Sequence, residues 1–145
     1  MPGDVTAALF SAHLGGHLSF GLGVRVNRTA FESPRDRYAP VCDESELNGG
    51  KLVGVELEGE SVVASRSEES GEVCAIAATC SHLGGPLDEG KRDADTVTCP
   101  WHGSRFDLCS GEVQGGPAVY PQPRYETRIR SGKVEIRIAK EDDKD

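Results

Sequence analysis

The sequence contains few of the large apolar residues that build extended helical cores. Its 145 residues include one Met and one Trp, and aromatic residues make up 6% of the chain. Apolar residues reach only 37%, but 18 glycines raise the combined share to the ordinary globular range of roughly 45–50%. Together with eight prolines, these glycines favour short strands joined by turns over long helices. The length fits a single domain, since domains usually span about 100–150 residues.

Long apolar runs are also absent. A transmembrane helix needs about 20 consecutive apolar residues, and the best candidate, segment 5–26, is interrupted by His13, His17, Arg25 and several glycines. The positive charge and apolar core of a secretory signal are missing as well. The sequence therefore predicts a cytoplasmic chain with no transmembrane segment, and membrane association through a longer or fused protein is the alternative.

Positive charge is scarce, because 16 Lys and Arg stand against 24 Asp and Glu, which gives a net charge of −8 at pH 7. An acidic surface repels phosphate backbones, so nucleic acid is not expected as a partner. A basic face on a partner protein suits this charge better, and a merely solvated acidic surface is the alternative. Four acidic residues of one connection are predicted to form the docking patch: Asp88, Glu89, Asp93 and Asp95.

Turn-forming residues divide the chain into three parts. Residues 1–37 lack clean periodicity and end in a turn-prone stretch, so they are interpreted as an N-terminal arm or remnant segment. The main domain is predicted to span residues 38–140, followed by an acidic tail, 141–145. A helical turn at 44–47 and a long connection at 83–95 are expected within the domain. Its strands are predicted at 38–41, 51–57, 61–65, 73–78, 96–98, 105–108, 112–114, 125–130 and 134–138.

Two short pairs of metal-binding residues stand out in the domain. Cys80 and His82 form the first pair, Cys99 and His102 form the second, and sixteen residues separate them. Each pair lies in a loop entered from a strand. Two sulfur and two imidazole ligands suit a closed zinc site or a [2Fe–2S] centre in which histidines bind one iron.

These pairs and their neighbours resemble the Rieske iron–sulfur proteins. The resemblance covers roughly residues 38–138 and rests on Cys80-Ser81-His82-Leu83-Gly84, Cys99-Pro100-Trp101-His102-Gly103-Ser104 and Gly116-Pro117-Ala118. It implies an all-β fold, an antiparallel β-sandwich with the cluster-binding loops at one tip and a proline loop covering them. It also implies that Cys80 and Cys99 hold one iron, while His82 and His102 hold the other through Nδ1. The expected cluster environment consists of Leu83, Gly84, Trp101, Ser104, Phe106 and Pro117.

The sequence departs from the high-potential members of this family at several places. Those members carry an extra cysteine in each loop and join the two loops by a disulfide, but Gly85 and Trp101 stand at these positions. They also donate hydrogen bonds to the cluster sulfurs from a Ser and a Tyr. Ser104 keeps the first donor, whereas Phe106 lacks the second hydroxyl. A reduction potential in the lower half of the family range of about −150 to +300 mV is therefore predicted.

Three cysteines remain beside the two pairs. Cys74 lies in an apolar run and is predicted to be a core residue, because free cysteine behaves as a small hydrophobe. Cys42 and Cys109 lie near turns, and nothing places them together. In a chain that is not exported, five cysteines favour metal or redox chemistry over disulfides.

Segment 11–31 is similar to the final stretch of a membrane domain that is fused ahead of Rieske domains in some bacteria. This similarity implies that residues 1–37 are a remnant of such a domain, and a disordered arm is the alternative.

The predicted function is that of a one-electron carrier of the Rieske ferredoxin kind, which passes electrons between a reductase and an acceptor oxidoreductase or oxygenase. It is not expected to be a complete enzyme, because no histidine follows His102 to complete a second iron site and no dinucleotide-binding glycine loop follows a strand. Two alternatives are a structural zinc module that mediates protein contacts and a cluster-bearing subunit of a larger oxidoreductase.

Overall fold

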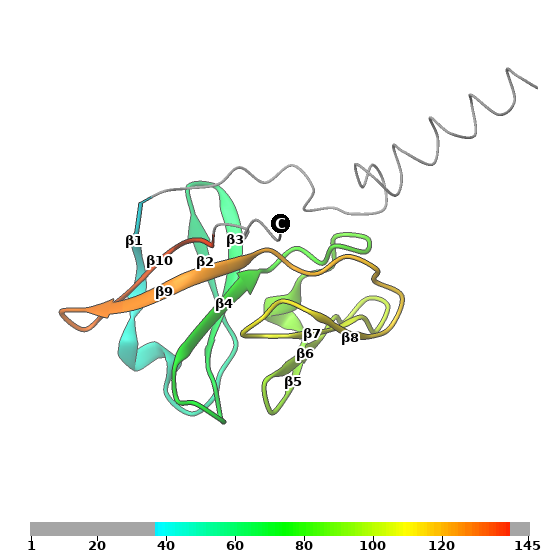
Figure 1. The fold of residues 1–145 in the computed structure, drawn as a ribbon, viewed down its shortest axis with the longest axis horizontal. Coiled ribbons are helices and arrows are strands. Elements are labelled where there is room, and N and C mark those ends of the chain that lie inside the picture. Colours follow the sequence, from blue (N-terminus) through cyan, green and yellow to red (C-terminus); the bar gives the residue numbers. More distant parts are fainter. Residues whose placement is uncertain (1–36, 140–145) are drawn as a thin grey trace, which may run out of the picture.

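The computed structural model describes residues 37–139, which fold into two antiparallel sheets (Figure 1). The base sheet has six strands, in the spatial order β1 (Ala39–Asp43), β10 (Lys133–Ile138), β9 (Arg124–Arg130), β4 (Val73–Ala77), β3 (Glu60–Arg66) and β2 (Val53–Leu57). The small sheet has four, in the order β5 (Lys91–Asp93), β6 (Thr96–Thr98), β7 (Arg105–Asp107) and β8 (Val113–Gly115). Two short 3-10 helices, η2 (Glu44–Leu47) and η3 (Leu87–Glu89), complete the elements. The expected all-β antiparallel architecture is confirmed.

The small sheet is inserted in the chain between β4 and β9, two neighbouring strands of the base sheet. Side chains alternate along a strand, and β4 is covered on both of its faces. Val73, Ala75 and Ala77 belong to a core enclosed by the base sheet, whereas Ile76 belongs to a second core that includes Val97 and Phe106 of the small sheet. Burial on both faces explains why this strand is a continuous apolar run in the sequence.

The second core also contains the two cysteines of the metal-binding pairs. Cys80 and Cys99 are buried in it beside Leu87, Leu108 and Ala118. The packing that joins the small sheet to the base sheet therefore extends up to the sulfur atoms.

Two pairs of neighbouring predicted strands, 51–57 with 61–65 and 125–130 with 134–138, form hairpins with two-residue turns. The β2–β3 hairpin turns through Glu58 and Gly59, and the β9–β10 hairpin turns through Ser131 and Gly132. All four residues have φ between 49° and 90°, as two-residue turns of type I′ require. The predicted long connection at 83–95 differs, since it contains η3 and β5. Lys91-Arg92-Asp93 has no apolar residue, so β5 leaves no alternating pattern and forms by pairing with β6.

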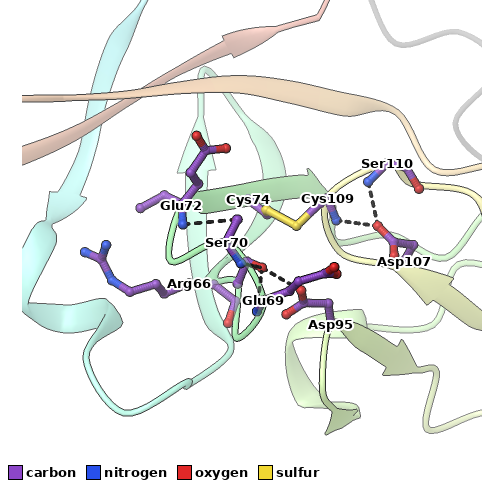
Figure 2. Close-up of a disulfide and its surroundings, with 12 residues drawn as sticks. Arg66, Glu69, Ser70, Glu72, Cys74, Asp95, Asp107, Cys109 and Ser110 are labelled. Atoms are coloured by element: carbon purple, nitrogen blue, oxygen red, sulfur yellow. Dashed lines mark hydrogen bonds between the residues drawn. A yellow bond between two sulfur atoms is a disulfide. The ribbon is translucent and has the colours of Figure 1, made fainter.

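One cysteine prediction is wrong. Cys74 of β4 and Cys109, which lies between β7 and β8, form a disulfide across 35 positions of sequence (Figure 2). Cys74 is thus not a free core residue, and the expectation that the cysteines serve metal or redox chemistry and not disulfides fails for this pair. The insertion of the small sheet brings the β7–β8 loop onto β4. Cys42, Cys80 and Cys99 are the free cysteines.

The predicted N-terminal arm, its similarity to a membrane domain, and the acidic tail fall on residues 1–36 and 140–145, outside the described part of the chain. Between residues 37 and 139, no helix has the length and apolarity needed to cross a membrane.

Candidate metal centre

The two loops that carry the metal-binding pairs have the same backbone construction. Cys80–Gly85 and Cys99–Ser104 are both six residues long. In each, the N–H of the first residue donates to the carbonyl of the sixth at 2.8 Å, and the N–H of the fifth donates to the carbonyl of the first, at 2.9 and 3.2 Å. The fifth residue is Gly84 or Gly103, with φ of 85° and 77°, a left-handed conformation that favours glycine. We name these segments the first and second ligand loops.

The two sulfur atoms lie together at the inner side of the site. Both cysteines are buried, and Cys80 contacts the Cys99 thiol directly. Burial raises the pKa of the Cys80 thiol above its ordinary value, and the Cys99 thiol adds to the rise. Peptide N–H groups of His82 and Leu83 donate to the Cys80 sulfur and lower that pKa in part. These donors point at an atom that becomes a thiolate when it binds a metal.

The two imidazoles form a second pair. The ring centroids of His82 and His102 are 5.2 Å apart, with the planes at 86°. Nδ1 of His82 is buried and has no hydrogen-bond partner among the described residues. A buried polar atom without a partner costs about 1–3 kcal/mol, and coordination of a metal removes that cost. His102 is exposed, so the imidazole side faces outward while the sulfur side faces the core.

The pairing of these donors fits a two-iron centre. Across residues 37–139, no three His, Cys, Asp or Glu side chains surround one common point. The four candidate ligands come instead as two adjacent sulfurs and two adjacent imidazoles. This arrangement suits a [2Fe–2S] core with one iron held by sulfur and the other by nitrogen, whereas a tetrahedral zinc site draws all four ligands around one ion.

The ligand loops touch each other through Gly85 and Trp101. A Cβ atom on Gly85 would lie 2.6 Å from the Cys99 sulfur and 3.0 Å from Cγ of Trp101. The indole therefore packs over a position that must stay without a side chain. Gly85 and Trp101 thus meet at the positions where high-potential Rieske proteins carry the disulfide that joins their two loops.

The proline loop, residues 116–123, lies against the second ligand loop. A Cβ atom on Gly116 would come within 2.6 Å of the Gly103 carbonyl oxygen and of Ser104 Cα. The Ser104 hydroxyl is buried and accepts a hydrogen bond from the Ala118 N–H at 3.1 Å. Pro117 itself is exposed. The proline loop thus holds the Ser104 hydroxyl in place.

Gln122 is a site residue that the sequence analysis missed. Its side chain is 3% exposed, and Oε1 accepts the N–H of Ser81 at 2.8 Å. Nε2 donates to the carbonyls of Ala77 and Thr79, both at 2.8 Å. The Ser81 hydroxyl adds a bond to the Tyr120 carbonyl at 2.7 Å. Gln122 therefore ties the proline loop to the first ligand loop, and no local pattern distinguishes it from an exposed glutamine.

The remaining predicted environment residues divide into buried and exposed sets. Phe106 is fully buried in the second core and has no hydroxyl. Leu83 and Trp101 are 42% and 58% exposed, and Val119 of the proline loop is 65% exposed. Only Ile129 joins these three as an exposed large hydrophobic side chain within residues 37–139. Exposed apolar surface is therefore concentrated around the candidate metal centre.

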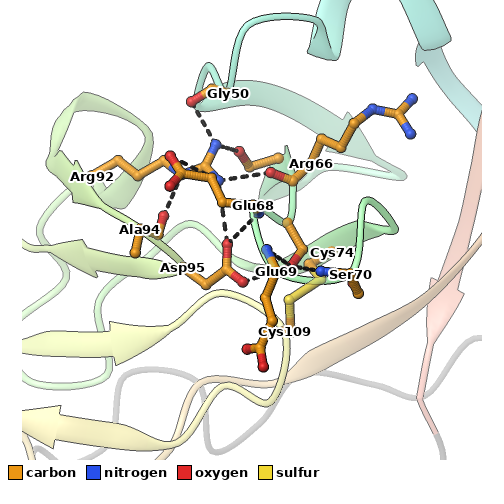
Figure 3. A network of polar contacts seen from close by, with 12 residues as sticks. Gly50, Arg66, Glu68, Glu69, Ser70, Cys74, Arg92, Ala94, Asp95 and Cys109 are labelled. Atoms are coloured by element: carbon orange, nitrogen blue, oxygen red, sulfur yellow. Dashed lines mark hydrogen bonds and ion pairs between the residues drawn. A yellow bond between two sulfur atoms is a disulfide. The ribbon is translucent and has the colours of Figure 1, made fainter.

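The predicted acidic patch is divided by the structure. The Asp95 carboxylate accepts hydrogen bonds from the Ser67 hydroxyl at 2.6 Å and the Glu68 N–H at 2.9 Å, and it pairs with Arg92 at 3.3 Å (Figure 3). Burial raises the pKa of Asp95, but these partners outweigh it and hold the pKa below the ordinary value. This carboxylate is committed to internal contacts, so Asp95 does not fit a docking role.

The other three acids lie at different positions. Asp88 packs over Gly54, since a Cβ atom there would lie 2.7 Å from Asp88 Oδ2. Glu89 and Asp93 are exposed. Asp93 stands at the β5–β6 turn, the opposite end of β6 from Cys99. Of the two exposed acids, only Asp93 is thus shown at a distance from the ligand loops.

Comparison with known proteins agrees with this geometry. The family model of the Rieske [2Fe–2S] domain matches residues 37–126. The chain belongs to the Rieske family. Apoptosis-inducing factor 3 of Mus musculus is 32% identical over 112 residues, which cover 77% of this chain but 18% of that protein. Ferredoxin CarAc of Metapseudomonas resinovorans is 29% identical over 99 residues, which cover 68% of this chain and 92% of the ferredoxin.

Solved structures of Rieske proteins share the fold. The Sphingomonas yanoikuyae B1 ferredoxin superposes with a TM-score of 0.64 and 26% identity, covering 70% of this chain and 98% of the ferredoxin. A chain from the complex of reduced oxygenase and oxidized ferredoxin in carbazole 1,9a-dioxygenase gives a TM-score of 0.64 and 27% identity, covering 71% of this chain and 94% of that chain. The expected Rieske-type sandwich is thereby confirmed, and a Rieske domain binds a [2Fe–2S] cluster.

Proposed function

We propose that this chain is a one-electron carrier that passes electrons from a reductase to an acceptor oxidoreductase or oxygenase. The arrangement of the candidate metal ligands supports this proposal most directly. Two buried sulfurs lie on one side, and two imidazoles, one of them exposed, lie on the other. Support comes from relatives that are ferredoxin components, such as that of the naphthalene 1,2-dioxygenase system of Pseudomonas putida, 27% identical over 95 residues. A cytoplasmic location stays part of this proposal.

The residues of the chain define how such a cluster would be held. Cys80 and Cys99 would ligate one iron, and His82 and His102 the other. When bound, a [2Fe–2S] cluster accepts and releases one electron. Two thiolates and two neutral imidazoles balance the +2 charge of an oxidised core, so reduction of the site costs less than it would with four thiolates.

The surroundings of the ligands control water and charge at the site. The second core excludes water from the sulfur side, while the exposed His102 ring leaves an edge open to a partner. The N–H groups that donate to the Cys80 sulfur stabilise negative charge there. In this proposal, the site for substrate oxidation belongs to the acceptor.

Electron paramagnetic resonance of the dithionite-reduced protein, with iron and sulfide assays on the same sample, tests the function. A rhombic signal of low average g-value, with two iron and two sulfide per chain, is expected for this ligand set. A colourless, silent protein that holds one zinc ion after reconstitution would contradict the carrier function and support the structural zinc module instead.

We further propose that partners dock on an apolar face formed by Leu83, Trp101 and Val119 around His102. The ligand loops and the proline loop contain no charged residue, although the chain carries a net charge of −8. The acids therefore lie outside the contact, and a partner with an uncharged apolar surface around its own redox centre fits this face. Apolar contacts of this kind depend little on salt.

Electron transfer from a dioxygenase-type ferredoxin reductase, measured between 0.05 and 0.5 M salt, tests this face. Val119→Ser is expected to lower kcat/KM several-fold with the same shallow salt dependence as the wild type. The charge reversals Glu89→Lys and Asp93→Lys are the controls and should leave the rate unchanged. A steep salt dependence that these two variants abolish would show that acidic residues make the contact.

A further inference from the structure

The Cys74–Cys109 disulfide closes a covalent ring around the whole metal centre. Its two cysteines are 35 positions apart, and all four candidate ligands, Cys80, His82, Cys99 and His102, lie between them in the sequence. The bond joins β4, which leads into the first ligand loop, to the loop that follows β7, which leads out of the second (Figure 2). The strand that leads into the first ligand loop and the segment that follows the second ligand loop are thus covalently linked.

The loop that carries Cys109 is itself closed in the same way as the ligand loops. Within Asp107–Glu112, the first N–H donates to the sixth carbonyl and the fifth N–H to the first carbonyl, both at 2.9 Å. The Asp107 carboxylate accepts the N–H groups of Cys109 and Ser110 at 2.8 and 2.7 Å. The disulfide therefore ends in a turn that is closed by two backbone hydrogen bonds and by two bonds to the Asp107 carboxylate.

The same loop contacts the residue that holds the first ligand loop. The carbonyl of Gly111 accepts the N–H of Gln122 at 2.8 Å, and a Cβ atom on Gly111 would lie 2.2 Å from the Gln122 carbonyl oxygen. The side chain of Gln122 in turn binds the N–H of Ser81. A continuous set of contacts thus runs from the disulfide to the residue between Cys80 and His82.

A polar network stands beside the disulfide at the junction of the two sheets. Arg92 of β5 is 8% exposed at its side chain and donates to the carbonyls of Gly50 and Arg66 and to the hydroxyl of Ser65. Figure 3 shows this network next to Cys74 and Cys109. The junction is therefore fixed by polar contacts on one strand and by a covalent bond at the neighbouring loop.

We propose that the Cys74–Cys109 disulfide is a positioning element of the cluster site, which keeps the two ligand loops assembled and slows release of the cluster. The inference rests on the proposed cluster, because it concerns how that cluster is retained. The ligand loops share no covalent link of their own, since Gly85 and Trp101 meet where a loop disulfide would stand. A closed ring limits how far the loops separate when the metal is absent.

Thiol titration of the denatured full-length protein, without reductant, is the first test. Three reactive thiols, from Cys42, Cys80 and Cys99, are expected in the metal-free chain. Five thiols in the isolated protein would overturn the proposal. This count does not depend on electron transfer, so it separates failure of the disulfide from failure of the carrier function.

Release of iron to a chelator, followed at a temperature well below unfolding, is the second test. Cys74→Ser/Cys109→Ser is expected to release iron at least tenfold faster than the wild type, with unchanged g-values. If Cys74→Ser/Cys109→Ser does not fold, Cys74→Val/Cys109→Ala replaces it in the same measurement, because its apolar side chains fill the space of the disulfide. Cys42→Ser should behave as the wild type.

A variant of matched stability separates positioning from global stability. Ile136→Ala removes a fully buried side chain from the core of the base sheet, outside the ring, and lowers the melting temperature without touching the ligand loops. Faster iron release in the disulfide variant than in Ile136→Ala, at equal distance below their melting temperatures, supports positioning. Equal rates would overturn it and leave the disulfide a contribution to overall stability only.

Discussion

Replacement of Gln122 by leucine tests whether one buried amide holds the proline loop on the first ligand loop. Leucine has a similar volume but offers no hydrogen bond. In the variant, the N–H of Ser81 and the carbonyls of Ala77 and Thr79 lose their side-chain partner. Ser81 and Ala77 are buried, so water cannot replace that partner without opening the loops.

The expected loss follows from these three hydrogen bonds. Each is 2.8 Å long, and a bond of this kind contributes about 1 kcal/mol net. A buried group left without a partner costs about 1–3 kcal/mol. At about 1 kcal/mol for each of the three bonds, Gln122→Leu should therefore destabilise the fold by at least about 3 kcal/mol. At about 4–8 °C per kcal/mol for a domain of this size, the melting temperature should fall by at least about 12 °C.

Thermal unfolding followed by circular dichroism gives the melting temperature, and hydrogen exchange reports the Ser81 amide directly. Gln114→Leu is the matched control, because Gln114 is exposed on β8 and its loss should stay within about 0.5 kcal/mol. A Gln122→Leu variant within about 1 kcal/mol of this control, or one in which the Ser81 amide stays protected, would refute the argument.

Three further substitutions test the site and its support. Gly85→Ala places a Cβ atom 2.6 Å from the Cys99 sulfur, so iron content should fall sharply. Gly49→Ala meets nothing within 4 Å and costs only the strain of a left-handed φ of 81° far from the ligands in sequence, so that variant should keep its iron. Asp95→Asn should cost about 1–2 kcal/mol at pH 7. Because the pKa of Asp95 is lowered in the fold, that contribution is present above the unfolded value near 3.8 and is lost as the pH falls through the folded value, so urea unfolding curves of wild type and variant should converge at low pH. Ser104→Ala should lower the reduction potential by about 40–90 mV in a redox titration, which corresponds to about 1–2 kcal/mol for one electron, and an unchanged potential would show that this hydroxyl does not reach the cluster.

The sequence was most informative where chemistry or alternation is local. Cys80, His82, Cys99 and His102 are recognisable because cysteine and histidine are rare and their spacings are short. Most strands show apolar alternation within a few consecutive residues, and a glycine in each type I′ turn indicates the position of that turn. β5 carries no such apolar alternation, because all three of its residues are charged and it forms a strand only by pairing with β6.

Contacts between distant segments explain what the sequence did not reveal. The pairing of Cys74 with Cys109 depends on how the small sheet lies on β4, which no local pattern records. Gln122 is buried only because the proline loop folds back onto the first ligand loop. Asp95 looked like any acidic surface residue, yet the Ser67 hydroxyl and Arg92 surround it.

The proposed docking face depends on where charge lies in the chain. Net charge describes the whole chain and does not say where charge is located. The relevant signal was present in the sequence, because the ligand loops and the proline loop contain no charged residue at all. Composition taken loop by loop predicts an uncharged face at the metal-binding pairs, whereas composition of the whole chain predicts an acidic docking patch, and the salt-dependence experiment distinguishes the two predictions.

The same six-residue closed loop occurs four times in the described chain, and this repetition explains how the metal centre is prepared. Besides the two ligand loops, Ser67–Glu72 and Asp107–Glu112 have the same two closing hydrogen bonds and a left-handed glycine at the fifth position. In these two, the first side chain, Ser67 or Asp107, accepts the N–H groups of the third and fourth residues.

In the first ligand loop the Cys80 sulfur takes the place of that oxygen, since the N–H groups of the third and fourth residues donate to it. The sulfur thus occupies a position that the fold elsewhere gives to an oxygen acceptor, an alcohol in one loop and a carboxylate in the other. Because the donors are fixed by the backbone of the loop, they are in place before any metal binds and need no rearrangement when charge on the sulfur changes. A carrier that gains and loses one electron benefits from such a site, since little of the surrounding structure has to move at each transfer.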